Sequence, residues 1–421
     1  MIPSLRHGAA WLALLLLLFC TLGANAADEP SAATEPGANL DVAIYTFGPG
    51  EEVWERFGHN AIEIRDRSKG TAILYNYGIF DFAQKNFFVN FARGLMIYRI
   101  AADDPAEELP NYVAEGRWIV RQNLNFTPAQ RSKLADFLAW NVREENAEYR
   151  YDYFRANCST RVRDALDQAL GGAIRAQTIA PSRGFTYRMD ADRLMRPDAA
   201  IMLLIDAGLG PFADQRLSYW DESFVPMEFM RHLREITVTD GAGNALPLVA
   251  SETQVAKARI PEPPEFPSRW TWQALAVGCV FALLLLLLPR ARATSAAARV
   301  AFAGSGFVLS IVLGISGIVL AALWSATDHQ SAWRNENLFL FDPLLLLLVP
   351  AWCGAYRARW QPSKFAMRIA FTVAAFAVFA WFSKILPGFR QDNAFWIALL
   401  LPVHVAIAFA FIAMRRKRPL A

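Results

Sequence analysis

The chain has 421 residues, of which 54% are hydrophobic and 13% aromatic, and its formal net charge is only +3. So weak a positive charge over so long a chain gives no basis for a nucleic-acid partner. The apolar residues gather at the two ends of the chain, which predicts an exported protein held in a membrane.

The first 26 residues have the three parts of a secretory signal peptide. Arg6 gives a basic start, residues 9–22 form an apolar run, and Ala24 and Ala26 are the small residues of a cleavage site. We predict that residues 1–26 are removed. Cys20 follows a phenylalanine, where a lipoprotein signal needs a small residue, so it leaves with the signal.

Residues 27–39 are rich in Ala, Pro and Glu and predict a disordered leader, and residues 40–260 have the pattern of an α+β domain. Alternation of apolar and polar residues is clearest over 59–66, where Ile62 and Ile64 alternate with charged side chains. Five strands are expected, at 40–48, 59–66, 71–79, 94–102 and 116–124.

Two helices follow these strands. One opens at Thr127, with Pro128 in its first turn. The other begins at Cys158, with Asn157 placed to cap it, has apolar residues at helical spacing, and ends at the glycine pair 171–172. Cys158 is therefore expected at a helix N-terminus.

The C-terminal part predicts an all-α transmembrane domain of about five helices, over residues 270–414. A proline-rich linker at 261–269 leads into it, and Trp270 and Trp272 stand at the expected interface. Asp342, Pro343 and Lys384 interrupt the third and fourth spans. The five apolar stretches lie near 270–289, 300–325, 338–356, 368–387 and 394–414.

The basic residues set the orientation of these spans. With the N-terminal domain outside, the inner segments hold 11 Lys and Arg residues and the outer loops hold three. This asymmetry predicts a bacterial inner-membrane protein with a periplasmic N-terminal domain and a basic cytoplasmic tail at 415–421.

Cys158 is the one cysteine between the signal and the first span, since Cys279 and Cys353 lie within spans, so the exported domain has no internal disulfide. The thiol is either a small buried apolar group or a reactive one. Polar neighbours favour reactivity, and the start of a helix favours the thiolate. Three nearby arginines are expected to act in the same direction: Arg155, Arg161 and Arg163.

His59 opens a predicted strand directly after a glycine, and a histidine of this kind beside a helix-opening cysteine is the arrangement of papain-like thiol enzymes. Asn76, on the next strand, is our choice for the group that orients the histidine, and Asp81 follows a few residues later. Each of these residues also has a purely structural interpretation, as a satisfied core or surface side chain.

Other chemistries are less well supported by the sequence. A metal site is disfavoured because there is a single cysteine and no His-x-x-x-His or Cys-x-x-Cys spacing. A serine hydrolase is disfavoured because Gly-x-Ser-x-Gly is absent. We expect no cofactor, and expect the backbone N–H of Cys158 to hold the oxyanion.

The order of histidine before cysteine, with Asn157 preceding the nucleophile, resembles the circularly permuted NlpC-type enzymes, which include the lecithin retinol acyltransferases. A closer resemblance, over nearly the whole mature chain, is to the Lnb family, whose N-terminal periplasmic domain precedes membrane spans. It is carried by "RFGHNAIEIRD", "YNYGIFDF", "YDYFRANCSTRVRDAL" and the loop "DHQSAWRNENLFLFDP", in which His329, Asn335 and Asn337 stand on matching positions.

The resemblance implies a lipoprotein N-acyltransferase with Cys158 as nucleophile and His59 as base. Its acyl donor would be a phospholipid and its acceptor the α-amine of diacylglyceryl-cysteine in lipoproteins, at the surface of the lipid bilayer. The segments 86–99 and 224–233 are aromatic-rich and basic, and either rest on the membrane or belong to the core. Two alternatives remain open: a cysteine peptidase or peptidoglycan amidase using the same pair, and a non-enzymatic membrane scaffold.

Overall fold

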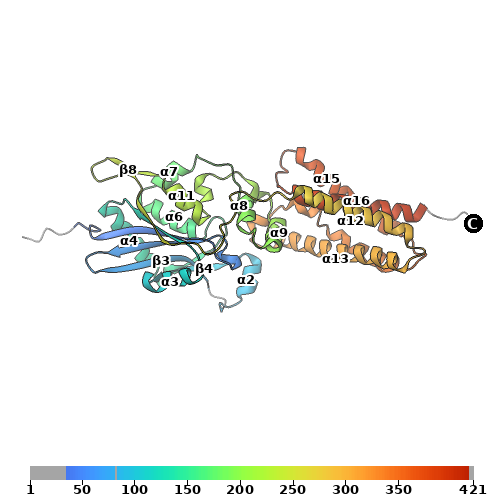
Figure 1. Ribbon diagram of the computed structural model, residues 1–421, viewed down its shortest axis with the longest axis horizontal. Coiled ribbons are helices and arrows are strands. Elements are labelled where there is room, and N and C mark those ends of the chain that lie inside the picture. Colours follow the sequence, from blue (N-terminus) through green and yellow to red (C-terminus); the bar gives the residue numbers. More distant parts are fainter. Residues whose placement is uncertain (1–34, 81–82, 417–421) are drawn as a thin grey trace, which may run out of the picture.

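The structure is a computed structural model that describes residues 35–80 and 83–416. The predicted signal peptide at 1–26, most of the predicted leader, Asp81 and the end of the basic tail lie outside the described residues. Figure 1 shows a mixed sheet and helix domain at one end of the molecule and a bundle of long helices at the other.

A seven-stranded antiparallel sheet forms the centre of the N-terminal domain, in the order β6-β4-β3-β2-β1-β5-β9. All five strands expected from the sequence are confirmed, with small differences at their ends. The strands are β1 (Leu40–Phe47), β2 (His59–Asp66), β3 (Thr71–Ile79), β4 (Ile97–Asp103), β5 (Ile119–Leu124), β6 (Glu148–Arg150) and β9 (Val249–Ala256). A separate ribbon pairs β7 (Thr237–Thr239) with β8 (Ala245–Pro247).

The two faces of the sheet are covered by different helices because side chains alternate along each strand. Ile62 and Ile64 of β2 pack with Val162 and Leu166 of α6 in the larger apolar core. Residues of the opposite parity, such as Phe47 and Leu74, pack under α3 in a smaller cluster. The helices of this domain are α2 (Phe87–Arg93), α3 (Pro105–Ala114), α4 (Pro128–Asn141), α5 (Glu144–Ala147), α6 (Cys158–Ala169), α7 (Ala173–Thr178), α8 (Tyr187–Leu194), α9 (Ala199–Gly208), α10 (Tyr219–Glu222) and α11 (Pro226–Leu233).

The segments 86–99 and 224–233 fold differently from each other. Residues 226–233 form α11, which buries Phe229 completely and packs on the sheet, so a membrane-surface role for this segment is wrong. Residues 87–93 form α2, whose Phe88 is 74% exposed and whose Val89 is also exposed. Figure 1 places α2 at the end of the domain nearest to the long helices.

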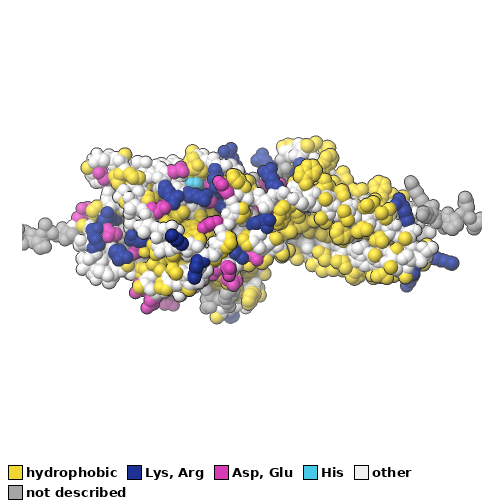
Figure 2. Space-filling model, in the orientation of Figure 1, with side chains coloured by type: hydrophobic (Ala, Val, Ile, Leu, Met, Phe, Trp, Pro, Cys, Tyr) yellow, Lys and Arg dark blue, Asp and Glu magenta, His cyan; other side chains and the backbone are white. Residues whose placement is uncertain are grey.

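Within the part of the chain that the structure describes, five helical segments are long and apolar enough to span a membrane: Thr271–Ala291, Ala296–Ala326, Glu336–Ala355, Lys364–Ile385 and Ala394–Arg415. Their regular parts are α12 (Thr271–Ala291), α13 (Ala296–Ala326), α14 (Val349–Ala355), α15 (Lys364–Phe382) and α16 (Ala394–Arg416). Figure 2 shows an apolar surface along this bundle and Lys and Arg side chains at its far end. The expected class, an α+β domain followed by five apolar helices, is confirmed.

Half of the third span consists of 3-10 turns, η4 (Glu336–Phe339) and η5 (Pro343–Leu348), and its polar residues lie at these turns. Asp342 caps one such turn by accepting from the backbone N–H of Leu344 at 2.9 Å, and Pro343 begins it. Lys384, at the end of the fourth span, pairs with Glu336 at the start of the third. Asp342 and Pro343 therefore lie at a break in the third span and Lys384 at the end of the fourth, where Asp342 Oδ1 and the Lys384 ammonium each find a partner.

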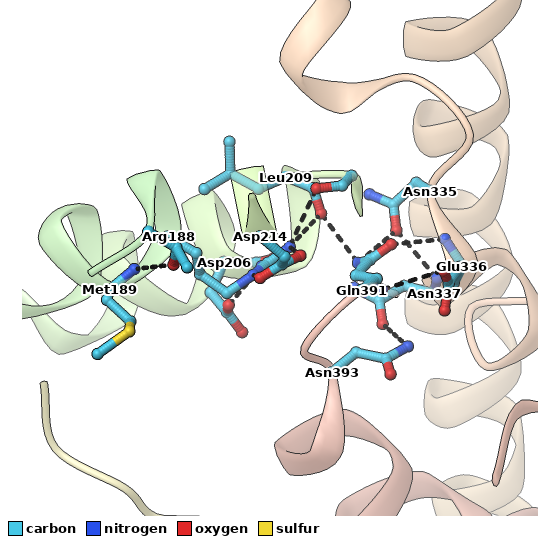
Figure 3. Close-up of polar contacts among 12 residues, drawn as sticks. Arg188, Met189, Asp206, Leu209, Asp214, Asn335, Glu336, Asn337, Gln391 and Asn393 are labelled. Carbon is cyan, nitrogen blue, oxygen red and sulfur yellow. Dashed lines mark hydrogen bonds and ion pairs between the residues drawn. The ribbon is translucent and has the colours of Figure 1, made fainter. Parts of the chain in front are cut away.

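A polar junction joins the two parts of the molecule, and Figure 3 shows its side chains. The last carbonyls of α9 lack partners within their helix, and amides from the membrane part supply them. Asn335 Nδ2 donates to the carbonyls of Ala207 and Gly208, both at 2.9 Å, and Gln391 Nε2 donates to that of Leu209 at 2.9 Å. The N-terminal domain is thus held against the membrane part by hydrogen bonds from residues that lie far in sequence from the linker between the two parts.

Candidate active site

Cys158 is the first residue of α6, and Asn157 caps that helix as expected. Asn157 Oδ1 accepts from the backbone N–H of Thr160 at 2.9 Å, while its Nδ2 donates to the carbonyl of Phe224 at 2.8 Å. The side chain is buried, and it joins the start of α6 to the segment between α10 and α11 and, through the carbonyl of Tyr153, to the loop before the helix. Ser159 Oγ donates to Asn60 Oδ1 at 2.7 Å and ties the first turn of α6 to β2.

Cys158 lies beside β3, where a Cβ on Gly78 would stand 3.3 Å from the Cβ of Cys158, and the next residue, Ser159, is bonded to Asn60 of β2. Burial raises the pKa of the Cys158 thiol above its ordinary value, although the backbone N–H groups of Asn60 and Ser159 act in the opposite direction. The expectation that the start of the helix lowers the pKa of Cys158 is therefore wrong in its net direction, because the effect of burial is larger than that of the backbone N–H groups.

The three arginines expected to support a thiolate are engaged elsewhere. Arg161 lies over the ring of Tyr149, with its guanidinium carbon 4.4 Å from the ring centroid. Arg163 pairs with Asp164 at 2.7 Å, and Arg155 bonds to Gln330 at 2.6 Å. Sequence proximity misled here, because successive residues of a helix point in different directions.

His59, Asn76 and Asp103 form a polar row across β2, β3 and β4, on the face covered by α3. His59 Nε2 lies 3.1 Å from Asn76 Oδ1, and Asn76 Nδ2 donates to Asp103 Oδ2 at 2.7 Å. Asn76, selected from its place on the neighbouring strand, thus meets His59 directly. Asp103 was missed, because β4 ends there and the turn sequence that follows resembles an ordinary helix cap.

The polar row fixes the orientation of the histidine ring. An ionised carboxylate only accepts hydrogen bonds, so Asp103 must face the Nδ2 of Asn76, and Asn76 Oδ1 is left to accept from His59 Nε2–H. The other ring nitrogen, Nδ1, then carries the lone pair. Burial lowers the pKa of His59 to about 4, although its bond to Asn76 acts in the opposite direction, so the ring is neutral near pH 7.

Arg117 and Tyr112 complete the surroundings of the pair. The charge of buried Arg117 lowers the pKa of both Cys158 and His59. Arg117 donates from Nε to the carbonyl of Gly48 at 2.8 Å and stacks over Tyr112, whose ring lies 6.3 Å from that of His59 between centroids. Neither residue had a signal in the sequence, since both depend on the packing of α3 against the sheet.

Two glycines make room for this arrangement. Gly58, before His59, has a φ of +79°, and a Cβ there would stand 2.7 Å from the carbonyl oxygen of Phe47. Gly78 has a φ of +92° at an irregularity in the pairing of β3 with β4. A Cβ on Gly78 would lie 3.3 Å from the Cβ of Cys158, so this backbone passes directly beside the thiol.

Three residues of the loop at 328–343 that resemble the Lnb family, His329, Asn335 and Asn337, lie in two different parts of the structure. His329 Nε2 lies 2.9 Å from the carbonyl oxygen of Phe91, and its ring stacks on Tyr153 at a centroid distance of 6.1 Å. Asn335 and Asn337 instead bind the end of α9 at the junction (Figure 3). In the described part of the chain, no group of three or more His, Cys, Asp or Glu side chains is arranged to hold a metal ion.

Comparison with known families divides the chain in the same two parts. Residues 28–190 match the model of the Lnb N-terminal periplasmic domain, and residues 274–417 match that of the Lnb transmembrane domain. Searches of curated proteins and of solved structures gave no match.

Proposed function

Because the chain belongs to the Lnb family and carries both its periplasmic and its transmembrane domain, we propose that it is a membrane-anchored cysteine acyltransferase. It moves a fatty acyl group from a phospholipid, by way of a thioester on Cys158, to the α-amine of diacylglyceryl-cysteine in lipoproteins. The observation that carries this proposal is the position of Cys158 at the start of α6, directly beside Gly78 of β3, while the neighbouring strand β2 begins at His59, which is backed by the polar row of Asn76 and Asp103.

In the first half-reaction, His59 Nδ1 takes the thiol proton while the sulfur bonds to the acyl carbon of the phospholipid ester. The ester C–O bond breaks, the proton passes from His59 to the departing oxygen, and a lysophospholipid leaves. In the second half-reaction, the acceptor amine attacks the thioester and the C–S bond breaks. The amine gives up a proton, which His59 returns to the sulfur of Cys158.

A neutral resting pair suits this sequence of steps. With the pKa of Cys158 raised and that of His59 lowered, both groups are uncharged near pH 7, so proton transfer accompanies attack on the ester. The backbone N–H of Cys158 at the start of α6 is the donor we assign to the oxyanion.

The proposed donor phospholipid would reach the N-terminal domain from the end that faces the membrane spans. The α2 helix presents exposed Phe88 and Val89 at the end nearest to the spans (Figure 1), where apolar side chains can enter the edge of a bilayer. We propose an inner-membrane location with the C-terminus in the cytoplasm, on the excess of Lys and Arg at the far end of the bundle (Figure 2).

The test replaces Cys158 with alanine in the full chain, in a strain without another N-acylating enzyme. Mass spectrometry of lipoprotein N-termini is expected to show free amines with Cys158→Ala and acylated amines with the matched control Cys279→Ala, whose thiol lies on a membrane helix. Acylated N-termini in the Cys158→Ala strain would refute the proposal. Release of free fatty acid without any acylated lipoprotein would favour the hydrolase alternative.

A further inference from the structure

A cavity of about 230 Å³ lies where three segments meet: the end of α2, the loop that leads into α6, and the loop after α13. The structure joins these segments by direct bonds, such as that from the backbone N–H of Asp328 to the carbonyl of Arg93 at 2.8 Å. The cavity is therefore made jointly by the periplasmic domain and the membrane domain.

Charged side chains of both signs line this cavity in equal number. Arg150 pairs with Asp328 at 2.9 Å, and Arg155 lies 3.4 Å from Asp152. The four side chains are between about a third and a half exposed, so these ion pairs are worth little and can be exchanged for a ligand at small cost. Each guanidinium also has five N–H donors, more than one carboxylate uses.

This lining fits a zwitterion better than an anion. Arginine forks bind phosphate oxygens in pairs, while carboxylates accept from an ammonium group. A simple anion would meet Asp152 and Asp328 as repelling charges, whereas a phosphate joined to a primary ammonium satisfies both signs. The cavity is smaller than the 300–1,000 Å³ or so that encloses a drug-sized ligand, so it has room for a lipid headgroup and not for acyl chains.

The cavity lies beside the loop that delivers the nucleophile. Tyr151 and Tyr153 line it, and their rings are 5.9 Å apart between centroids. Both tyrosines belong to the loop at 151–157, which leads directly to Cys158, the first residue of α6. The ester carbonyls of a glycerophospholipid are only a few bonds from its phosphate, so a headgroup held here brings an ester toward Cys158.

The rim of the cavity points the acyl chains toward the bilayer. Gly94, which ends α2, lines the cavity, and the exposed Phe88 and Val89 lie on that same helix. A polar recess next to exposed apolar side chains matches the two halves of a phospholipid.

We propose that this cavity binds the phosphoethanolamine headgroup of the donor lipid, its phosphate on Arg150 and Arg155 and its ammonium on Asp328 and Asp152. The inference rests on the proposed acyltransferase function. It assigns the loop after α13 a share in donor selection, so that the membrane domain contributes directly to the site.

The experiment compares three donors with the same acyl chains in mixed micelles with the purified full chain: phosphatidylethanolamine, phosphatidylglycerol and diacylglycerol. Intact-protein mass spectrometry follows the acyl group on Cys158. The wild type is expected to use phosphatidylethanolamine at least tenfold faster than diacylglycerol at low donor concentration. Arg150→Gln and Arg155→Gln should each raise the KM for phosphatidylethanolamine about tenfold.

Two further variants sharpen the result. Arg234→Gln is the matched control, because Arg234 forms an ion pair of similar length and exposure with Glu252, at 2.8 Å, on the far edge of the sheet. It should leave the donor ranking unchanged. Asp328→Asn removes a negative charge and should shift the preference toward phosphatidylglycerol. Equal use of all three donors, or an equal loss with every donor in the arginine variants, would overturn the headgroup assignment.

A binding measurement separates this proposal from the acyltransferase proposal. The full chain with Cys158→Ala is titrated by calorimetry with soluble glycerophosphoethanolamine and, separately, with inorganic phosphate. Binding of the first alone, weakened by Arg150→Gln, supports the headgroup site even if no donor acylates Cys158, a result that would refute only the proposed reaction. Equal binding of inorganic phosphate, or no binding of either, counts against the site.

Discussion

Replacing Gly78 with alanine should impair the thiol far more than it impairs the fold. With φ at +92°, an alanine at this position costs about 1–2 kcal/mol of backbone strain. Its Cβ would also stand 3.3 Å from the Cβ of Cys158, closer than ordinary van der Waals contact, so the cysteine must move by a few tenths of an ångström. Misplacement by 1 Å can cost about a hundredfold in rate, so we expect about a tenfold slower acylation of Cys158.

Gly172→Ala is the control for backbone strain, since Gly172 has a φ of +91° and open space around its Cβ position, just beyond the other end of α6. Both variants should lower the Tm of the N-terminal domain by about 2–8 °C in a thermal melt. Only Gly78→Ala should slow formation of the Cys158 thioester, followed by intact-protein mass spectrometry. Equal rates in the two variants would refute the view that Gly78 makes room for the nucleophile.

Four further predictions concern the polar row, the protonation of Cys158 and of His59, and the junction. Asp103→Ala should lower kcat about tenfold, the value of one hydrogen bond to a charged group, and Asp103→Asn, which can still accept from Asn76, should restore most of it; an unchanged kcat in Asp103→Ala would remove Asp103 from the site. Alkylation of Cys158 by iodoacetamide should rise with pH beyond neutrality, because its pKa is raised, and a rate already maximal at pH 6 would instead indicate a thiolate. The fold should lose stability as the pH falls from 6.5 toward 4, since the pKa of His59 is lowered in the fold and protonation favours the unfolded chain; thermal melts of His59→Gln should lack this part of the pH dependence. Asn337→Ala should destabilise the full chain by about 1–3 kcal/mol, because this fully buried amide serves both α9 and Asn393, and a melt like that of the wild type would contradict a holding role for the junction.

Local patterns in the sequence predicted those parts of the fold that depend on neighbouring residues. The alternation in 59–66 gave β2, and the capping asparagine before Cys158 gave the first residue of α6. The pairing of strands that lie far apart in the sequence could not be predicted from such local patterns. The strand β9, from Val249 to Ala256, joins the sheet beside β5 across more than a hundred residues and carries mostly exposed side chains.

In the candidate site as well, only the contact between neighbouring strands could be predicted from the sequence. Asn76 could be chosen because strands that follow each other in sequence often pair, but Asp103 and Arg117 enter only through tertiary packing. The direction of the pKa shift of Cys158 was predicted wrongly because the dipole of a helix can be inferred from sequence, whereas the extent of burial cannot.

The junction has a consequence for the encounter between enzyme and lipid. A domain tethered only by its proline-rich linker would swing through a wide volume above the bilayer, and its thiol would spend little time at the depth of an ester bond. The side-chain amides of Asn335 and Gln391 restrict this motion of the domain, because they donate hydrogen bonds to the carbonyls at the end of α9. Confinement of this kind raises the effective concentration of a reacting group without adding any contact to the substrate. In the proposed reaction, the membrane bundle would therefore both anchor the N-terminal domain and hold Cys158 at a fixed height above the bilayer.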